Sequence, residues 1–434
     1  MPLKAGKEYD EYMYNFIDNI CKNIGPRLAT KPEEHKCIGV IQEELNKSCD
    51  ETFTQDFKTA FLAYPRGLLR WAGGFCLIGI FFLFTIIPWV CAILCVTGLF
   101  LALTELLFLK DYLDIFYAKG ISKNVFGRIK PKSGAPKKYL IFGGHSDSAI
   151  ELPFAKLGVD AMQRRMFLAI GFGIFAILWA IVKAILPCAL GCIVINPFFI
   201  LSWLDVGLVC IFIPWLIYFL YILFGFFGSE MVQGANDNLS GVAVACAIAK
   251  YMKDVGYRPN NVEILVGSFG SEEAGQRGSR AFVQQTSKEI LDNSYTVVLE
   301  SVGGGEGVGI LKAETMYNMV NKKFPFIHPI RHHPDVYNRV YQAYEKCHEK
   351  KKGLPPIQLA EAKFAGTDAT RFSEKTPPYP ACAIVAGLIT TFFLKNWHCK
   401  EDTPENLNKN MMNFVLNIAL EFIELVDKEY DKNP

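Results

Sequence analysis

Two long segments of the chain are almost free of charge, whereas the rest alternates polar and apolar positions. Residues 71–104 contain no charged residue, and residues 166–227 contain only Lys183 and Asp205. A straight helix over 71–104 would be roughly 50 Å long, well beyond the ~30 Å hydrocarbon core of a bilayer. Pro88 lies near the middle of this segment, so we expect two shorter helices joined by a turn at this proline.

The second apolar segment predicts helices over 166–182 and 206–227, each long enough to span a bilayer. The stretch between them, which includes Asn196-Pro197, is also apolar and predicts either a re-entrant segment or a third span. Buried core helices of a soluble protein are the alternative for both segments, but their lengths favour membrane spans.

The remaining parts of the chain have the pattern of an α/β protein. Short apolar runs predict buried strands at 139–142, 262–266, 296–299 and 382–386. Helical spacing of apolar residues predicts helices within 1–24, at 32–47 and at 242–252. A last helix should begin after Thr403-Pro404 and bury Leu407, Met411, Val415, Phe422 and Val426. Strands mixed with helices indicate an α/β sandwich.

Composition excludes some classes of protein. Hydrophobic residues make up 51% of the chain and charged residues only 20%. The net charge of +2, from 45 basic and 43 acidic residues, gives no electrostatic footprint for nucleic acid. The 13 cysteines are odd in number and lack framework spacing, which argues against a secreted disulfide scaffold. The charged, helical pattern of residues 1–24 is not that of a signal peptide.

Five short segments carry residues that can bind metal, namely His145, Asp237, Glu273, Glu300 and His398. Three of these residues closely follow predicted buried strands, and side chains at the carboxyl ends of such strands gather at one edge of a sheet. Two imidazoles and three carboxylates suit zinc or a similar divalent ion. A carboxylate shared by two ions can hold them ~3.5–4 Å apart, the spacing of two-metal hydrolytic sites.

Two further carboxylates adjoin these ligands. Asp147 lies two residues after His145 and can accept a hydrogen bond from the ring nitrogen that does not bind metal. In the Glu272-Glu273 pair, one carboxylate can bind metal while the other takes a proton from water, provided that burial raises its pKa. Each segment alone has an ordinary explanation as a turn, a solvated face or a structural histidine; the ordered set is what indicates a site.

In chain order, the five segments read HxD (145–147), GANDNxSG (234–241), SEEAGxxGS (271–279), LESVG (299–303) and WHxxEDTPEN (397–406). This order closely resembles the co-catalytic zinc aminopeptidases, a broad family that includes bacterial leucyl aminopeptidases and glutamate carboxypeptidase. Residues 24–28 (IGPRL) and 54–57 (TQDF) resemble the start of the same domain, so the likeness covers nearly all of the chain outside the apolar segments.

The resemblance implies a three-layer α/β/α sandwich with a mixed central sheet and two Zn²⁺ ions. One ion would be held by His145, Asp237 and Glu300, and the other by Asp237, Glu273 and His398. Asp237 would bridge the ions, Glu272 would be the general base for a metal-activated water, and Asp147 would orient His145. The position of Glu300 is often Asp in the family, and the longer side chain can change the metal preference. Residues 365–372 resemble a family loop near the active site, and no role is assigned to them.

The family normally has a short connection between its first histidine and the bridging aspartate, but here Asp237 lies 92 positions after His145. We therefore expect one peptidase domain, formed by 1–67, 110–163 and 229–434, with transmembrane insertions at 68–109 and 164–228. Because the flanks of each insertion belong to one domain, each insertion must cross the bilayer an even number of times. This predicts four spans in two hairpins and an integral, multi-pass protein with the lipid bilayer as a partner.

Basic residues near the ends of the spans mark the cytoplasmic side of a membrane. Arg66, Arg70, Lys110, Arg164 and Arg165 flank the apolar segments on the side of the peptidase domain. The opposite connections have none, if Lys183 is counted within a span. The sequence therefore predicts that the catalytic domain faces the cytoplasm.

The favoured function is a zinc-dependent exopeptidase, an aminopeptidase that hydrolyses peptides. Carboxypeptidase and dipeptidase activity are alternatives of the same fold, and a cyclotransferase resembling glutaminyl cyclase is disfavoured because those enzymes use one metal. A membrane receptor or assembly subunit that has lost its ligands is disfavoured because the ligands are retained. A transporter is disfavoured because the spans carry no charges apart from Lys183 and Asp205, near the expected ends of the spans. Finally, His328, His332 and His333 could line the cleft or stabilise an oxyanion, but a solvent-facing loop is the favoured interpretation.

Overall fold

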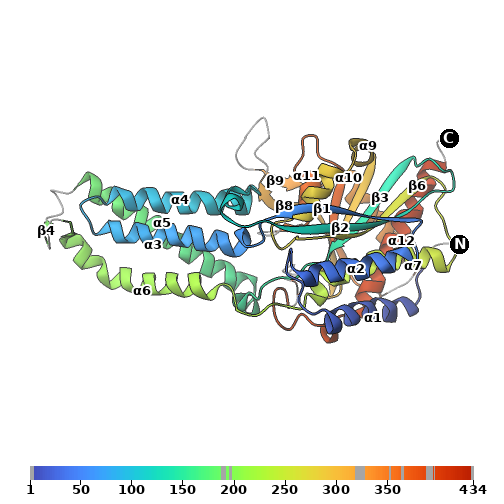
Figure 1. The fold of residues 1–434 in the computed structure, drawn as a ribbon, viewed down its shortest axis with the longest axis horizontal. Coiled ribbons are helices and arrows are strands. Elements are labelled where there is room, and N and C mark those ends of the chain that lie inside the picture. The colour runs from blue at the N-terminus through green and yellow to red at the C-terminus, as the bar shows by residue number, and fades with distance from the viewer. Residues whose placement is uncertain are drawn as a thin grey trace. The chain divides into compact units, whose positions relative to one another are not determined.

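The chain forms two compact units, each built from separate stretches of sequence (Figure 1). The first comprises Met1–Phe61, Lys119–Glu151 and Glu230–Pro434, and the second comprises Leu62–Ala118 and Leu152–Ser229. The computed structural model describes residues 4–186, 192–194, 198–317, 328–350, 353–362, 366–387, 394 and 396–431.

A mixed sheet forms the centre of the first unit. Its strand order is β1-β2-β6-β3-β7-β11-β8-β10, with β9 paired to β8. Neighbours β6, β3, β7 and β11 are parallel, whereas β1 with β2, β2 with β6, and β8 with β11 are antiparallel. The strands are β1 Glu51–Thr59, β2 Gly120–Ile129, β3 Lys138–His145, β6 Val262–Phe269, β7 Ser294–Glu300, β8 Gly307–Tyr317, β9 Pro329–Arg331, β10 Ile357–Ala362 and β11 Ala381–Gly387.

The four strands predicted from apolar runs lie within β3, β6, β7 and β11, so these predictions are confirmed. Every residue of β6, β7 and β11 is buried. Parallel strands that are covered on both faces read as continuous apolar runs rather than alternating ones, which is why the sequence made them visible.

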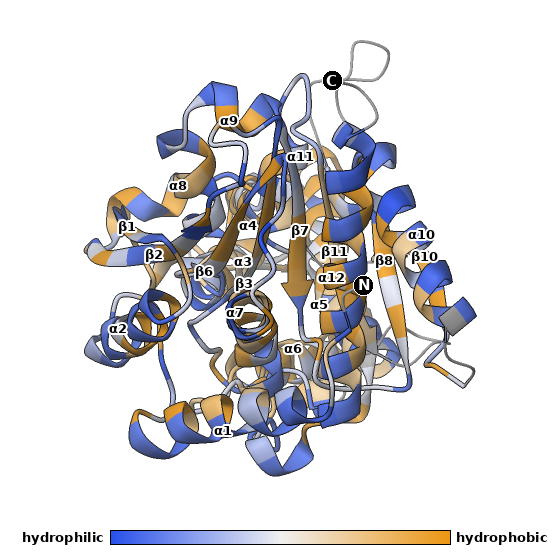
Figure 2. Ribbon diagram, turned by 90° about the vertical axis from the view of Figure 1, so that its right-hand side faces the viewer, coloured by the Kyte–Doolittle hydropathy of each residue, from blue (hydrophilic) through white to orange (hydrophobic). Residues whose placement is uncertain are grey.

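Helices cover both faces of this sheet. Along β3, Leu140 and Phe142 join one hydrophobic cluster and Ile141 joins another, because successive side chains point to opposite faces. Figure 2 shows largely hydrophobic strands between helices, of which α1 and α2 carry both hydrophobic and hydrophilic residues. The first cluster contains residues of α1 Glu8–Asn23, α2 Pro32–Asn46, α7 Ser240–Asp254, α10 Pro334–Lys350 and α12 Lys409–Asp431. The second contains residues of α8 Arg277–Gln285, α9 Lys288–Asp292 and α11 Ala369–Ser373.

The predicted helices near the N-terminus and at 242–252 are confirmed as α1, α2 and α7. The predicted start of the last helix is wrong. Pro404 begins only a single 3₁₀ turn, Pro404–Asn406, and α12 begins at Lys409. Asn408 is the reason, since its side-chain Oδ1 accepts the backbone N–H of Met411 at 3.2 Å, as a helix N-cap does. Leu407 precedes the helix, while the other four predicted core residues of α12 are buried.

The second unit consists mainly of four long helices that lie alongside one another (Figure 1). They are α3 Leu68–Leu83, α4 Trp89–Leu107, α5 Val159–Ile185 and α6 Trp203–Gly225. The predicted break at Pro88 is confirmed, because this residue caps the N-terminus of α4. All four helices are long and apolar enough to cross a membrane.

The connection between α5 and α6 was predicted to be a re-entrant segment or a third span. Its described residues form two short paired strands, β4 Cys192–Val194 and β5 Ile200–Ser202. Residues 187–191 and 195–197, including Asn196-Pro197, lie outside the described residues. The described part of the unit therefore contains four helices of spanning length, which matches the predicted even number of crossings.

The outer surface of these helices is apolar, and a buried ion pair joins α5 to α6. Ile93, Phe100, Leu178 and Ile217 are each more than half exposed. Lys183 Nζ lies 2.7 Å from Asp205 Oδ2, and Trp179 Nε1 donates to Asp205 Oδ1 at 2.8 Å. An exposed apolar surface of this extent is typical of a protein that contacts lipid or a partner.

Candidate metal centre

Three adjacent parallel strands bring the first site residues together. His145 is the last residue of β3 and Glu300 the last of β7, while the loop with Glu272 and Glu273 follows β6 closely. Because β6, β3 and β7 are neighbours in the same direction, their carboxyl ends meet at one edge of the sheet. The structure therefore brings His145, Glu300 and the Glu272-Glu273 loop to the same edge of the sheet, as predicted.

Asp237 lies just before α7, and its two carboxylate oxygens face different histidines. Oδ1 is 3.1 Å from His145 Nε2, and Oδ2 is 3.3 Å from His398 Nε2. Glu300 Oε1 lies 3.7 Å from the same nitrogen of His145, and Glu273 Oε1 lies 3.2 Å from that of His398. The five residues thus form two groups of three that share Asp237, and the candidate ligand atoms within each group lie within 4.8 Å of one another.

The spacing and chemistry of these groups fit zinc. Bonds of ~2.0–2.1 Å in a tetrahedral zinc site place neighbouring ligand atoms ~3.3 Å apart, close to the spacing between each histidine and its carboxylates. In addition, Glu273 Oε1 is buried, and the atom 3.2 Å from it is a ring nitrogen of His398, which is itself a candidate ligand. His145, Asp237 and Glu300 could hold one ion, and Asp237, Glu273 and His398 a second.

The electrostatics of the site reflect a surplus of buried carboxylates. Burial raises the pKa of Glu300 to about 7, although the neighbouring His145 opposes this shift. Burial by itself would lower the pKa of His398, but Glu273 and Asp237 raise it to about 10. In the metal-free protein, protons on the imidazoles therefore balance part of the negative charge. Metal ligands must be deprotonated, so ions that enter this site would displace those protons.

Glu272 lies beside the two groups. Its Oε2 is 3.9 Å from His145 Nε2, and burial, against the charge of His145, raises its pKa well above the usual value. A raised pKa suits a carboxylate that must hold a proton during a reaction. Candidate ligand atoms of His145, Glu272 and Glu273 also lie within 4.8 Å of one another, so substitution must separate the roles within the pair.

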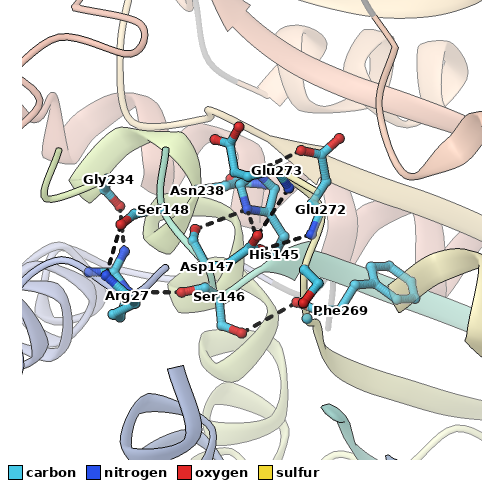
Figure 3. A network of polar contacts seen from close by, with 12 residues as sticks. Arg27, His145, Ser146, Asp147, Ser148, Gly234, Asn238, Phe269, Glu272 and Glu273 are labelled. Atoms are coloured by element: carbon cyan, nitrogen blue, oxygen red, sulfur yellow. Dashed lines mark hydrogen bonds and ion pairs between the residues drawn. The ribbon is translucent and has the colours of Figure 1, made fainter. Parts of the chain in front are cut away.

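Asp147 has more partners than the sequence indicated (Figure 3). Its Oδ1 lies 3.3 Å from His145 Nδ1, in keeping with the predicted contact. Its two oxygens also accept the backbone N–H groups of Glu272 at 2.9 Å and Glu273 at 3.0 Å. A single carboxylate thus links the first histidine to the loop that carries both glutamates.

Two buried carboxylates were missed as parts of the site. Asp402 accepts the backbone N–H groups of Asn236 at 2.6 Å and Asp237 at 3.0 Å, so it ties the bridging residue to the loop of His398. Its place in the WHxxEDTPEN segment was the available signal. Glu34 on α2 accepts the backbone N–H of Ser271 at 2.9 Å, and burial, reinforced by the charge of Asp147, raises its pKa to about 8. Nothing in the helical pattern of 32–47 distinguished Glu34 from a solvated glutamate.

The loop resembling a family active-site loop adjoins the glutamate pair. Arg371 Nη2 donates to Gly275 O at 2.7 Å, and Thr370 Oγ1 donates to Gln276 Oε1 at 2.8 Å. Neither carboxylate oxygen of Asp368 has a hydrogen-bond partner among the residues described, and burial raises its pKa to about 7. Position 365 of this loop lies outside the described residues.

The favoured solvent-facing interpretation is wrong for His332. The ring is buried because β9 pairs with β8, and its Nε2 lies 2.9 Å from Glu314 Oε1 while its Nδ1 lies 2.8 Å from Ser373 Oγ. Glu314 also accepts the backbone N–H of Thr367 at 2.6 Å. His332 therefore supports the 366–373 segment through Glu314 and Ser373. The side chain of His333 is partly exposed.

Comparison with known proteins agrees with this geometry. Residues 224–423 match the profile of peptidase family M28. Just under half of the chain is therefore similar to this family. The match includes Asp237, Glu272, Glu273, Glu300 and His398 but starts after His145, which the fold brings to the site. No match was found among curated proteins.

Solved structures share the M28 fold at low sequence identity. A zinc aminopeptidase from Bacillus subtilis is 15% identical, with a TM-score of 0.53 over 98% of this chain and 95% of that one. A leucine aminopeptidase precursor from Bacteroides thetaiotaomicron is 16% identical, with a TM-score of 0.52 over 95% and 96%. A glutaminyl cyclase from the same species is 15% identical, with a TM-score of 0.53 over 95% and 97%. The α/β fold with a mixed sheet is therefore that of M28 aminopeptidases, and because a cyclase shares it, the fold does not choose the activity.

Proposed function

We propose that the protein is a membrane-embedded, zinc-dependent exopeptidase and acts as an aminopeptidase. The observation that carries the proposal is the placement of Asp237, whose two oxygens lie 3.1 and 3.3 Å from two different histidines. A carboxylate in this position can bridge two ions, which is the arrangement of a co-catalytic hydrolase. Zn²⁺ ions bound there would supply a Lewis acid that polarises the scissile carbonyl and acidifies a water.

The residues around the ligands suit the proton transfers that peptide hydrolysis needs. Glu272 takes the proton of the attacking water and returns it to the leaving amine nitrogen, because its raised pKa lets it hold that proton. Asp147 holds His145 and the backbone of Glu272 in fixed positions relative to each other, because its carboxylate contacts both. The enclosure of these groups strengthens each electrostatic contact in the site.

Charge around the site favours recognition of an amino terminus over a carboxyl terminus. Three buried carboxylates, Glu272, Glu300 and Asp368, raise one another's pKa, so an α-ammonium group bound beside them would stabilise their ionised forms. Arg27 and Arg371, which are buried near the ligand loops, donate to backbone carbonyls. The names of the aminopeptidases that share the fold point the same way.

The membrane part of the proposal rests on the second unit. Its four helices have the length and apolar composition of spans, and their outward residues are apolar. Arg66 and Lys110 flank α3 and α4, and Arg70, Arg164 and Arg165 lie near the N-terminal ends of α3 and α5. Basic residues at these helix ends support a cytoplasmic catalytic unit.

Metal analysis combined with a substrate panel tests the proposal. The full-length protein, purified in detergent or nanodiscs, should bind close to two zinc ions and hydrolyse aminoacyl reporters and unblocked peptides. N-acetylated peptides should be poor substrates, and peptides with an N-terminal glutamine should be hydrolysed rather than cyclised. Cyclisation of those peptides with a single bound ion would replace the peptidase assignment by a cyclase. Failure to bind any divalent ion would refute both.

A further inference from the structure

Arg27 is fully buried, and among the described residues its side chain donates hydrogen bonds to backbone carbonyls alone (Figure 3). Nε donates to Ser146 O at 2.8 Å, Nη1 to Gln233 O at 2.7 Å, and Nη2 to Gly234 O at 3.1 Å. Nη1 also donates to Gly25 O at 2.9 Å, within the loop of Arg27 itself. The backbone adds two hydrogen bonds: the N–H of Arg27 donates to Ser148 Oγ at 2.8 Å, and the N–H of Ser148 donates to Arg27 O at 3.0 Å.

The carbonyls that Arg27 gathers belong to two chain segments that carry proposed metal ligands. Ser146 and Ser148 lie one and three residues after His145, and Gln233 and Gly234 lie four and three residues before Asp237. The 152–229 insertion separates these two segments in the sequence. They also pair with each other, because Ile150 and Met231 form an antiparallel bridge and the N–H of Val232 donates to Ala149 O at 3.1 Å.

Arginine is specific to this position. Its planar guanidinium carries five N–H donors in a fixed fork, so one side chain can reach carbonyls of several segments at once. A lysine ammonium has three donors at a single point and cannot span them. Gly234 has a positive φ of 60°, and an added Cβ would lie 2.5 Å from Asp237 O and 3.1 Å from Arg27 Nη2. The second segment is therefore shaped to approach the guanidinium closely.

We infer that Arg27 is a positioning residue that sets the separation of His145 and Asp237 by joining the segments on either side of the 152–229 insertion. The two ligands lie 3.1 Å apart at their Nε2 and Oδ1 atoms although 92 positions separate them in the chain. Arg27 joins the outgoing and returning segments and so preorganises the ion site of His145, Asp237 and Glu300. It does so without contacting an ion or substrate. This inference rests on the proposed metal site.

The test compares Arg27→Lys with Arg128→Lys in the full-length protein. Arg128 belongs to the same unit and pairs with Glu263 at 3.0 Å, so it is a matched loss of an arginine fork away from the ligand loops. Zinc affinity is measured by chelator competition, and ligand geometry by the visible absorption of the Co²⁺-loaded protein. Substitution of residues that orient metal ligands typically lowers metal affinity or activity by ~10–100-fold. Arg27→Lys should lower the affinity for one ion by that factor and change the Co²⁺ spectrum, while Arg128→Lys changes neither.

A purely structural role gives a different result. If Arg27→Lys melts at a lower temperature but keeps wild-type zinc affinity and a wild-type Co²⁺ spectrum, the inference is overturned. If Arg27→Lys does not fold, Ser148→Ala is tested instead, because it removes the Oγ that accepts the backbone N–H of Arg27. This variant should weaken the binding of the same ion, and an unchanged zinc affinity overturns the inference. Absence of zinc binding in the wild-type protein would instead refute the proposed function, so the two failures are distinguishable.

Discussion

Asp147→Asn should slow catalysis by disturbing the loop of Glu272 and Glu273 without removing a metal ligand. The carboxylate of Asp147 accepts the N–H groups of both residues, at 2.9 and 3.0 Å. Asparagine is nearly isosteric but offers one carbonyl oxygen, so its NH₂ group must face one of these donors. One charge-assisted hydrogen bond is lost, which costs about 1.5–3 kcal/mol. If the whole cost falls on the transition state, kcat decreases by about 10- to 150-fold.

Steady-state kinetics and metal analysis of the purified variant check this expectation. Asp50→Asn is the matched control, because Asp50 also accepts a backbone N–H, from Lys130 at 2.8 Å, and pairs with Arg258. It should leave kcat unchanged. In a Glu272→Gln background, Asp147→Asn should have little further effect, because residues that act as a unit are not additive. A kcat for Asp147→Asn within about threefold of wild type would show that this carboxylate does not govern the placement of the glutamates.

Three further predictions concern the same chain. Glu272→Gln should keep zinc and lose at least ~10²–10⁴-fold in kcat, whereas Glu273→Gln should lose zinc as well; the reverse pattern in metal analysis would exchange their roles. The pKa of Glu34 is raised to about 8 by burial, so the folded state binds its proton more tightly than the unfolded state. Its contribution to stability should therefore decline as pH rises from about 4.5 to 8, and melting temperatures across this range should fall less steeply in Glu34→Gln. An impermeant thiol reagent should not label Cys49 or Cys347 in intact cells if the catalytic unit is cytoplasmic; labelling that depends on either cysteine would refute the orientation.

Much of the fold was predictable because its strongest signals are local. The buried strands β3, β6, β7 and β11 are continuous apolar runs, and the turn before α4 follows from Pro88 in an uncharged segment. The start of α12 was misplaced because two capping sites compete, and a single turn ends before Asn408 begins the helix.

The candidate site was predictable only where residue types themselves suggest chemistry. His145, Asp237 and His398 stood out as metal-binding residues in motifs. Glu34 did not, and Arg27 lay in the matching segment 24–28 without an assigned role. The roles of both depend on contacts with residues more than 100 positions away. His332 was misassigned because its burial depends on the pairing of β9 with β8. Long-range polar contacts leave no periodic trace in the sequence.

The interrupted course of the catalytic unit constrains its biogenesis. β2 pairs with β6, yet the chain between them contains α5 and α6, two of the four apolar helices. The ribosome therefore synthesises β2 before these two helices and its partner β6 only after them. His398, one of the two histidines that face Asp237, emerges later still. Sheet pairings between distant residues form slowly and leave strand edges exposed in the meantime. If the apolar helices enter a membrane during synthesis, as proposed, the chain contacts the membrane before its sheet is complete. β1 and β2 can pair with each other early, but the other edge of β2 stays exposed until β6 has been made.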